Sequence, residues 1–194
     1  MIVAVDLDEV VFNFIDPYFE FLSEKYGRKL TRADMTDWSS ERMGFIPRGS
    51  SRENLLEFGR LDGFRNLPFM PGAEKGLFDL TNHHSVVFIT SREPEARYDT
   101  EAVLDETGYG HIPLYFSNSQ GTTKGMILAN MNAHYLIDDN PEFINEARHR
   151  FRSCVSILMS EIPKAIMAVG GNDIVSGWDE LRIKRPELFE VRRV

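Results

Sequence analysis

The stretch MIVAVDLDEV at residues 1–10 decides the fold. Its apolar run, Ile2–Val5, ends directly in an acid, which is typical of a buried strand in a parallel sheet. Similar apolar runs recur at residues 85–90, 112–116, 135–137 and 154–158. We therefore expect five buried strands, each ending where polar residues begin.

Helical patterns fill the intervals between these runs. We expect helices from Pro71-Gly72 to about Thr81, from Pro94 to about Gly108, over Lys124–Met131 behind a Thr122 or Thr123 cap, and from Pro141 to about Arg150. Strands that alternate with helices imply a parallel sheet covered on both faces. The predicted fold class is α/β, a Rossmann-like parallel sheet flanked by helices.

One segment, from about Phe14 to Phe69, breaks this alternation. Its apolar residues at positions 15, 18, 19, 22 and 26 fall on one face of a helix that Gly27 stops, and a second short helix is expected near residues 53–61. No strand is evident in it. We therefore predict a catalytic core of residues 1–13 and 70–194, with a small helical cap of residues 14–69 inserted after the first strand.

The composition narrows the setting in which this protein acts. A chain of 194 residues with 42% hydrophobic content suits one compact domain with a small insert. No apolar run approaches the ~20 residues that cross a bilayer, and the first residues lack the basic region of a signal peptide. The single cysteine, Cys154, excludes an intrachain disulfide, so we expect a cytoplasmic protein without a membrane partner.

The net charge of −8 argues against a nucleic-acid partner, because a surface that holds a long phosphate backbone is usually basic. A small phosphate ester needs only a few local donors and a cation. The oligomeric state stays open, with a homodimer among the alternatives.

Polar residues follow the predicted strands where those strands end. Asp6 and Asp8 follow the first, Thr90-Ser91-Arg92 the second and Asp138-Asp139 the fourth, while Lys124 begins the helix after the third. Ligands of open α/β sheets bind beyond the carboxyl ends of the strands, where these four groups can converge. Each group alone is commonplace as a turn, a helix cap or a solvated lysine. The ordered set of four is what indicates an active site.

Charge balance then predicts a metal ion. Two carboxylates ~4 Å apart repel by about 4 kcal/mol at an effective dielectric near 20, and four aspartates, at positions 6, 8, 138 and 139, would share this edge. Lys124 supplies one positive charge. Oxygen ligands with room for water suit Mg²⁺ as the remaining compensation, so these four aspartates are the predicted metal residues.

The same residues predict the reaction. The carboxylate of Asp6 can attack phosphorus to form an aspartyl-phosphate, and Asp8 can protonate the leaving group and later deprotonate the attacking water. The Thr90 hydroxyl and the amide of Ser91 would hold phosphate oxygens, and Lys124 would neutralise the charge that grows on them.

With its motifs in this order, the sequence resembles the haloacid dehalogenase-like hydrolase superfamily. The motifs are DLDEV (6–10), FITS (88–91), Lys124 in TTKG and LIDDNP (136–141). The resemblance implies a Rossmann-like core, Mg²⁺ and an aspartyl-phosphate on Asp6, with Asp8 as the acid/base. It also implies that the metal is held by Asp6, by the main-chain carbonyl of Asp8 and by one acid of LIDD.

A narrower resemblance is to the 5′(3′)-deoxyribonucleotidases. It is carried by LPFMPGAEKGLFDL (67–80), by LIDDNP and by VSGWDELRIKRPELF (175–189). It implies a (deoxy)nucleoside monophosphate as substrate, with Phe14 over the base or sugar, and we predict further substrate contacts at Trp38 and Arg92. Two departures from that pattern are Glu9, where glycine is usual, and Ser91-Arg92-Glu93, where proline is usual.

Several alternatives remain, and a phosphoryl transferase or a phosphonatase on the same fold is among them. Residues 90–108 also resemble the corresponding region of polynucleotide 3′-phosphatases, although the acidic charge argues against a nucleic-acid end as substrate. A phosphatase of another small metabolite would read its substrate through Trp38, Arg48 and Arg52. A non-catalytic binding protein is disfavoured because all four motifs, Asp8 included, are intact.

Overall fold

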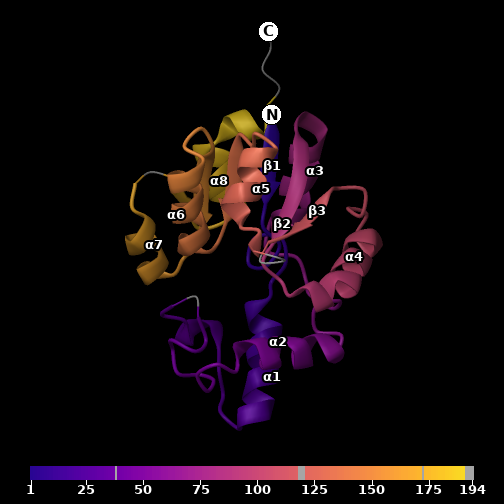
Figure 1. Cartoon of the computed structure of the whole chain (residues 1–194), viewed down its shortest axis with the longest axis vertical. Helices are drawn as coiled ribbons and strands as arrows, with labels where there is room; N and C mark the ends of the chain where they lie inside the picture. The colour runs from indigo at the N-terminus through magenta and orange to yellow at the C-terminus, as the bar shows by residue number, and fades with distance from the viewer. Residues whose placement is uncertain (38, 118–120, 172, 191–194) are drawn as a thin grey trace.

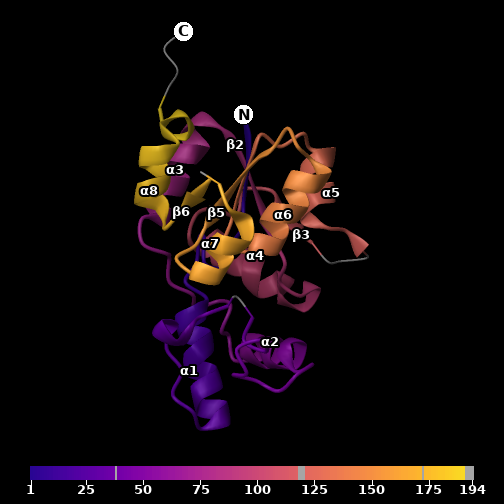
Figure 2. The ribbon, with the colours of Figure 1, turned by 90° about the vertical axis from the view of Figure 1, so that its left-hand side faces the viewer.

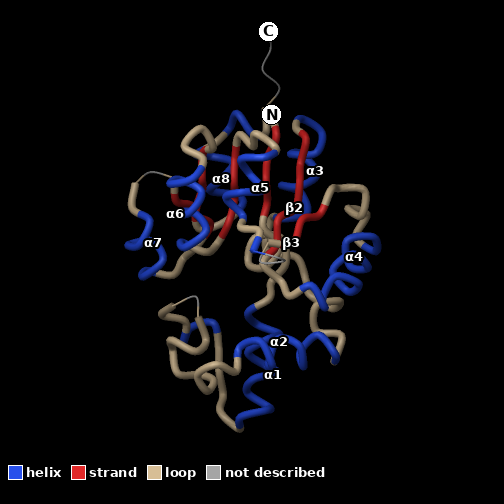
Figure 3. The backbone as a smooth tube through the Cα atoms, in the orientation of Figure 1, coloured by secondary structure: helices blue, strands red, loops and turns tan. Residues whose placement is uncertain are grey.

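A six-stranded parallel sheet forms the centre of the computed structural model, which describes residues 1–37, 39–117, 121–171 and 173–190. The strands are β1 (Ile2–Val5), β2 (Ser85–Thr90), β3 (Leu114–Phe116), β4 (Tyr135–Asp138), β5 (Val155–Met159) and β6 (Ile174–Val175). Their order in the sheet is β3-β2-β1-β4-β5-β6. Figure 1 labels β1, β2 and β3, and Figure 3 draws the strands in red. The first three strands thus form one half of the sheet, with β1 at the centre and β3 at the edge. The chain then returns to the other side of β1, where β4, β5 and β6 form the second half.

Helices cover both faces of this sheet, which is why β1 reads as an unbroken apolar run. Val3 and Val5 face one hydrophobic cluster and Ala4 faces the other, and all three side chains are fully buried. The helices α3 (Ala73–His83) and α8 (Trp178–Lys184) lie on one face. On the other lie α5 (Lys124–Asn130), α6 (Pro141–Arg150) and α7 (Pro163–Val169) (Figure 2).

A close approach at Gly76 joins α3 to α8. A Cβ atom added at Gly76 would lie 2.0 Å from the indole of Trp178, so only glycine lets the two helices approach this closely. The indole is buried, and its Nε1 donates a hydrogen bond of 2.7 Å to the carbonyl of Val10. This contact ties the C-terminal helix to the loop that follows β1.

The α/β class predicted from the sequence is confirmed, with differences at the ends of elements. Residues 94–96 form a 3₁₀ turn before α4 (Arg97–Glu106), and β3 begins after Pro113 rather than at residue 112. Thr123 rather than Thr122 caps α5, accepting a hydrogen bond from the Met126 amide. The sequence prediction lacked α7 and β6, because neither exceeds seven residues and their periodicity is too short to stand out.

The segment inserted after β1 is helical in the described residues. It holds α1 (Ile15–Tyr26), a 3₁₀ turn (Arg32–Asp34) and α2 (Ser51–Arg60). The predicted apolar face of α1 is buried at Ile15, Tyr18, Phe19 and Leu22, and Gly27 ends the helix with a φ of 62°. These helices lie beyond the carboxyl ends of the strands (Figure 1). We call residues 14–69 the cap, although that division of the chain stays a prediction.

Candidate active site

The site lies where the order of the strands reverses. β1 pairs with β2 on one side and with β4 on the other, so the residues that follow β1 and end β4 meet at one crevice. Asp6 is the first residue after β1, and Asp138 is the last residue of β4. Both carboxylates are buried, at 4% and 0% exposure.

Lys124 bridges these two carboxylates from the start of α5. Its Nζ donates to Asp6 Oδ1 at 2.6 Å and to Asp138 Oδ2 at 2.7 Å. The Lys124 side chain is completely buried, so all three charges are shielded from solvent. The second oxygen of Asp138 accepts the amide of Asn140 at 2.9 Å, which fixes the plane of that carboxylate. Three of the four predicted motifs therefore meet in one hydrogen-bonded unit.

One lysine does not compensate the whole acidic group. Burial, together with the negative charges of Asp138 and Asp8, raises the pKa of Asp6 to about 7, although Lys124 opposes the rise. Burial also raises the pKa of Asp139, as do the charges of Asp138, Asp6 and Glu9. Burial alone would lower the pKa of Lys124, but Asp138 and Asp6 outweigh that effect and raise it, so the ammonium keeps its charge.

Carboxylate oxygens of Asp6, Asp138 and Asp139 converge within 4.8 Å of one another. An all-oxygen donor set of this size is what Mg²⁺ prefers, and a divalent cation would compensate the charges that raise these pKa values. The residues present therefore fit a magnesium site. Asp8 is not in this group of ligand atoms, because its side chain points to another partner.

The Asp8 carboxylate is paired with Arg92. Its Nη2 lies 2.6 Å from Asp8 Oδ1, and its Nε lies 3.2 and 3.0 Å from Oδ1 and Oδ2. The amide of Arg92 donates to the Thr90 hydroxyl oxygen at 3.1 Å. Thr90 is buried at the end of β2, and Ser91 beside it is half-buried. The second motif thus stands directly against the loop that follows β1.

Glu9 has a structural reason to differ from the usual glycine. Its φ is 61°, a left-handed conformation that side chains rarely adopt. Its Oε1 accepts the amides of Phe14 (2.9 Å) and Ile15 (2.8 Å) at the start of α1, and its carboxylate pairs with Arg32 from the cap. The side chain therefore stabilises the N-terminus of α1 against the cost of its backbone conformation.

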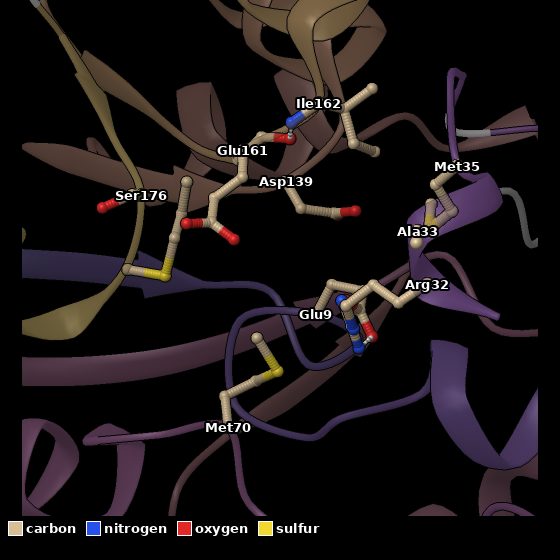
Figure 4. Close-up of a pocket in the computed structure, with 11 residues that line it drawn as sticks. Glu9, Arg32, Ala33, Met35, Met70, Asp139, Glu161, Ile162 and Ser176 are labelled. Carbon is tan, nitrogen blue, oxygen red and sulfur yellow. Dashed lines mark hydrogen bonds and ion pairs between the residues drawn. The ribbon is translucent and has the colours of Figure 1, made fainter.

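A cavity of about 410 Å³ opens beside the acidic group, between core and cap. Its lining includes Glu9, Arg32, Met35, Met70, Asp139 and Glu161, and the carboxylates of Asp139 and Glu161 both face into it (Figure 4). Three methionines, Met35, Met70 and Met159, form apolar parts of the wall, and Ser160 and Ser176 add hydroxyl groups. The lining of the cavity thus combines apolar side chains with carboxylates.

Ion pairs join the cap to the core at several points. Arg42 pairs with Glu142 at 3.0 Å, and the buried Asp37 pairs with Lys164 of α7. On the other side, Arg52 of α2 pairs with Glu93 and Glu95. The cap therefore covers the carboxyl ends of the strands and is held on two sides.

The sequence matches the family described as 5′ nucleotidase, deoxy (pyrimidine), cytosolic type C protein (NT5C) over residues 1–182. The chain belongs to this family. It is accordingly a phosphoric monoester hydrolase of the haloacid dehalogenase-like superfamily, as the four motifs predicted. A comparison with curated proteins found no match.

Solved structures share the fold of this nucleotidase-family chain. A haloacid dehalogenase-like hydrolase from Streptococcus pneumoniae aligns with a TM-score of 0.68 and 12% identity, covering 94% of this chain and 96% of its own. A HAD family hydrolase from Deinococcus radiodurans, with bound phosphate and sodium, aligns with a TM-score of 0.66 and 14% identity. The match covers 96% of this chain and 95% of that protein. An HAD-hydrolase from Bacillus subtilis, bound to magnesium, aligns with a TM-score of 0.59 and 14% identity. The match covers 94% of this chain and 96% of that protein. At these identities the likeness shows the fold alone.

The predicted substrate residues of this family member have different placements. Phe14 is half-buried and stacks on Tyr18 with ring centroids 4.8 Å apart, within an aromatic cluster that also includes Phe58 and Phe64. Trp38 lies outside the described residues. Arg92 is buried against Asp8. The sequence prediction missed Arg32 and Glu161, which carried no signal because charged loop residues are usually solvated.

None of the helices in the described residues combines the length and apolar character needed to cross a membrane.

Proposed function

We propose that this protein is a magnesium-dependent phosphatase that hydrolyses (deoxy)nucleoside monophosphates through an aspartyl-phosphate on Asp6. The observation that supports it most is the buried unit of Asp6, Lys124 and Asp138. Asp139, the next residue along the chain, lines a cavity of about 410 Å³. That volume suits a nucleoside, since small-molecule sites commonly span ~300–1,000 Å³.

The reaction proceeds in two steps. In the first, a carboxylate oxygen of Asp6 bonds to phosphorus, the bond from phosphorus to the ester oxygen breaks, and Asp8 gives that oxygen its proton. In the second, water attacks phosphorus, Asp8 takes a proton from the water, and the bond between Asp6 and phosphorus breaks. Inorganic phosphate leaves, and both aspartates return to their starting states.

The transferring phosphoryl group is surrounded by donors. Lys124 lies against Asp6 and so provides a positive charge where the phosphoryl oxygens gather charge in the transition state. The Thr90 hydroxyl and the Ser91 amide supply neutral donors from the end of β2 on the neighbouring strand. These are the phosphate-binding residues that the sequence predicted.

Mg²⁺ would be held by Asp6, by Asp138 or Asp139 and by the main-chain carbonyl of Asp8. When bound, it supplies positive charge to the phosphoryl oxygens and to the crowded carboxylates. The fit of the site rests on the three carboxylates whose oxygens converge within 4.8 Å.

The lining of the cavity favours a substrate with a single phosphate. Glu9, Asp139 and Glu161 contribute three carboxylates, while the Arg32 guanidinium is already bonded to Glu9, Asn13 and Asp16. Further phosphates on the substrate would be repelled by these carboxylates. The methionines offer polarisable apolar surface to a base or sugar. A mononucleotide therefore fits better than a nucleotide triphosphate or an oligonucleotide end.

The test is a comparison of wild type with Asp6→Asn. We expect Asp6→Asn to lose turnover at least ~10²-fold while it folds normally, and Asp105→Asn, on the exposed face of α4, to keep wild-type activity. Near-native activity of Asp6→Asn would refute the covalent route. Full activity in excess EDTA would refute the metal.

A substrate screen completes the test. We expect the deoxynucleoside monophosphates to be preferred over their triphosphates, over small sugar phosphates and over a 3′-phosphorylated oligonucleotide. Preference for the oligonucleotide would replace the proposed function with that of a polynucleotide 3′-phosphatase, and preference for a sugar phosphate would replace it with that of a metabolite phosphatase.

A further inference from the structure

We propose that Arg92 is a positioning residue that holds the carboxylate of Asp8 in the orientation needed for proton transfer, rather than a residue that contacts the substrate. The proposal rests on the proposed function, because it assigns Arg92 to the proton-transfer step of that reaction. It concerns two residues that are 84 positions apart in the sequence.

The contact has the geometry of a fork on a carboxylate. Nη2 of Arg92 lies 2.6 Å from Asp8 Oδ1, and Nε lies 3.0 Å from Oδ2, so both carboxylate oxygens are held. Two parallel N–H donors fix the carboxylate plane as well as its position. No single hydrogen bond could do this, because the terminal torsion of an aspartate is broad.

Arg92 is itself anchored on every side, so it can act as a fixed support. Its Nη1 donates to the Thr100 hydroxyl at 3.0 Å, and that hydroxyl donates to the carbonyl of Ala96 at 2.7 Å. The ring of Phe64, from the cap, lies 4.7 Å from the guanidinium carbon. The anchor therefore combines the first turn of α4 with an aromatic face of the cap.

The burial of the Arg92 side chain argues for a positioning role and against direct contact with the substrate. The Arg92 side chain is 1% exposed, whereas that of Asp8 is 25% exposed. All three guanidinium nitrogens already donate to Asp8 or Thr100. Asp8 thus stands between Arg92 and the open part of the site, and Arg92 reaches the reaction only through Asp8.

A group that acts only on proton transfer should matter most when the leaving oxygen needs a proton. The alkoxide of a nucleoside leaves poorly without one, whereas p-nitrophenolate leaves as a stable anion. Loss of Arg92 should therefore slow the nucleoside ester far more than the aryl ester. A purely structural lesion would slow both to the same extent.

The experiment measures kcat/KM, which covers the steps up to release of the leaving group and not the later hydrolysis of the aspartyl-phosphate that both esters share. It compares wild type, Arg92→Met and Arg92→Lys on a deoxynucleoside monophosphate and on p-nitrophenyl phosphate. We expect Arg92→Met to lose about 100-fold on the nucleotide and less than about 10-fold on the aryl ester, within the range that positioned acid–base groups contribute. Arg92→Lys, which keeps the charge but not the fork, should fall between. Arg97→Met, the same change at an exposed position where α4 begins, should match wild type.

A double-mutant cycle with Asp8→Asn separates positioning from substrate contact. If Arg92 acts through Asp8, adding Arg92→Met to Asp8→Asn changes kcat/KM on the nucleotide by less than about 3-fold. Losses that multiply in the double variant would overturn the proposal and restore a substrate contact. Equal losses on both esters would overturn it in favour of a structural role.

Two further measurements keep the outcomes distinct. If Arg92→Met does not fold by circular dichroism, Thr100→Val removes the anchor of Nη1 instead, and the same selective loss is expected at a smaller size; an unselective loss would overturn the proposal. Wild-type protein that hydrolyses neither ester with Mg²⁺ would contradict the proposed function, whereas an active wild type with unselective Arg92 variants contradicts only this inference.

Discussion

Replacing Lys124 by methionine tests whether the buried charges of the site depend on one another. Lys124 is fully buried, with its Nζ 2.6 and 2.7 Å from carboxylates of Asp6 and Asp138. Methionine fills much of the same volume but leaves both carboxylates without their cation. The perturbation is thus electrostatic, with little change in packing.

The size of the effect follows from the burial of the pair. Removing one partner of a buried ion pair typically costs about 3–5 kcal/mol, because the charge left behind is neither solvated nor paired. Here two carboxylates are left, but Asp6 already has a pKa of about 7 and can take up a proton. We therefore expect Lys124→Met to lower the free energy of unfolding by about 3 kcal/mol at about pH 8, where Asp6 is ionised in the wild type.

The assay is urea unfolding in EDTA, followed by circular dichroism, with and without added Mg²⁺. Lys75→Met, at an exposed position of α3, is the matched control and should stay within about 0.5 kcal/mol of wild type. Magnesium at about 100 times its dissociation constant stabilises the folded state by about 2.7 kcal/mol, and it should recover most of the loss in Lys124→Met.

A variant that unfolds like Lys75→Met would refute this reasoning. It would show that the carboxylates of Asp6 and Asp138 are compensated without Lys124 in the folded protein. A large destabilisation that magnesium leaves unchanged would refute the second part, namely that a cation binds among these carboxylates.

Two further predictions concern neighbouring acids. Between pH 3.8 and about 7, folded metal-free protein keeps on Asp6 a proton that the unfolded chain has released. Its stability relative to Asp6→Asn should therefore fall as pH rises through about 5 to 7, by up to about 1.4 kcal/mol per pH unit, in urea unfolding with EDTA; a rise would contradict the raised pKa. Glu9→Gln removes the charge that faces the start of α1 and Arg32. We therefore expect it to lower the free energy of unfolding, measured by thermal unfolding, by about 1 kcal/mol. Glu20→Gln, at an exposed position of α1, serves as its control, and an equal effect of both changes would argue against a role for Glu9 at the helix start.

Much of the catalytic group could be predicted from the sequence because it depends on where strands end. Asp6, Thr90 and Asp138 each stand at a strand terminus, and in a parallel sheet those termini share one edge. The convergence of Asp6, Lys124 and Asp138 follows from this topology and is present in the structure. Which side chains bond to each other at this edge could not be predicted from the sequence. The hydrophobic period shows which face of an element a residue occupies, but not which neighbour its side chain contacts.

The strand Ile2–Val5, followed by Asp6 and Asp8, decides the fold. It illustrates both what the sequence can predict and what it cannot. The sequence by itself determined the buried strand, the acids at its end and the apolar stripe of α1, since these depend on residue order and local period. Only the tertiary structure decided that Asp8 faces Arg92, that Glu9 caps α1 from a left-handed conformation, and that Arg32 and Glu161 line the cavity. Those contacts join residues far apart in the chain, and their geometry depends on how the cap packs against the sheet.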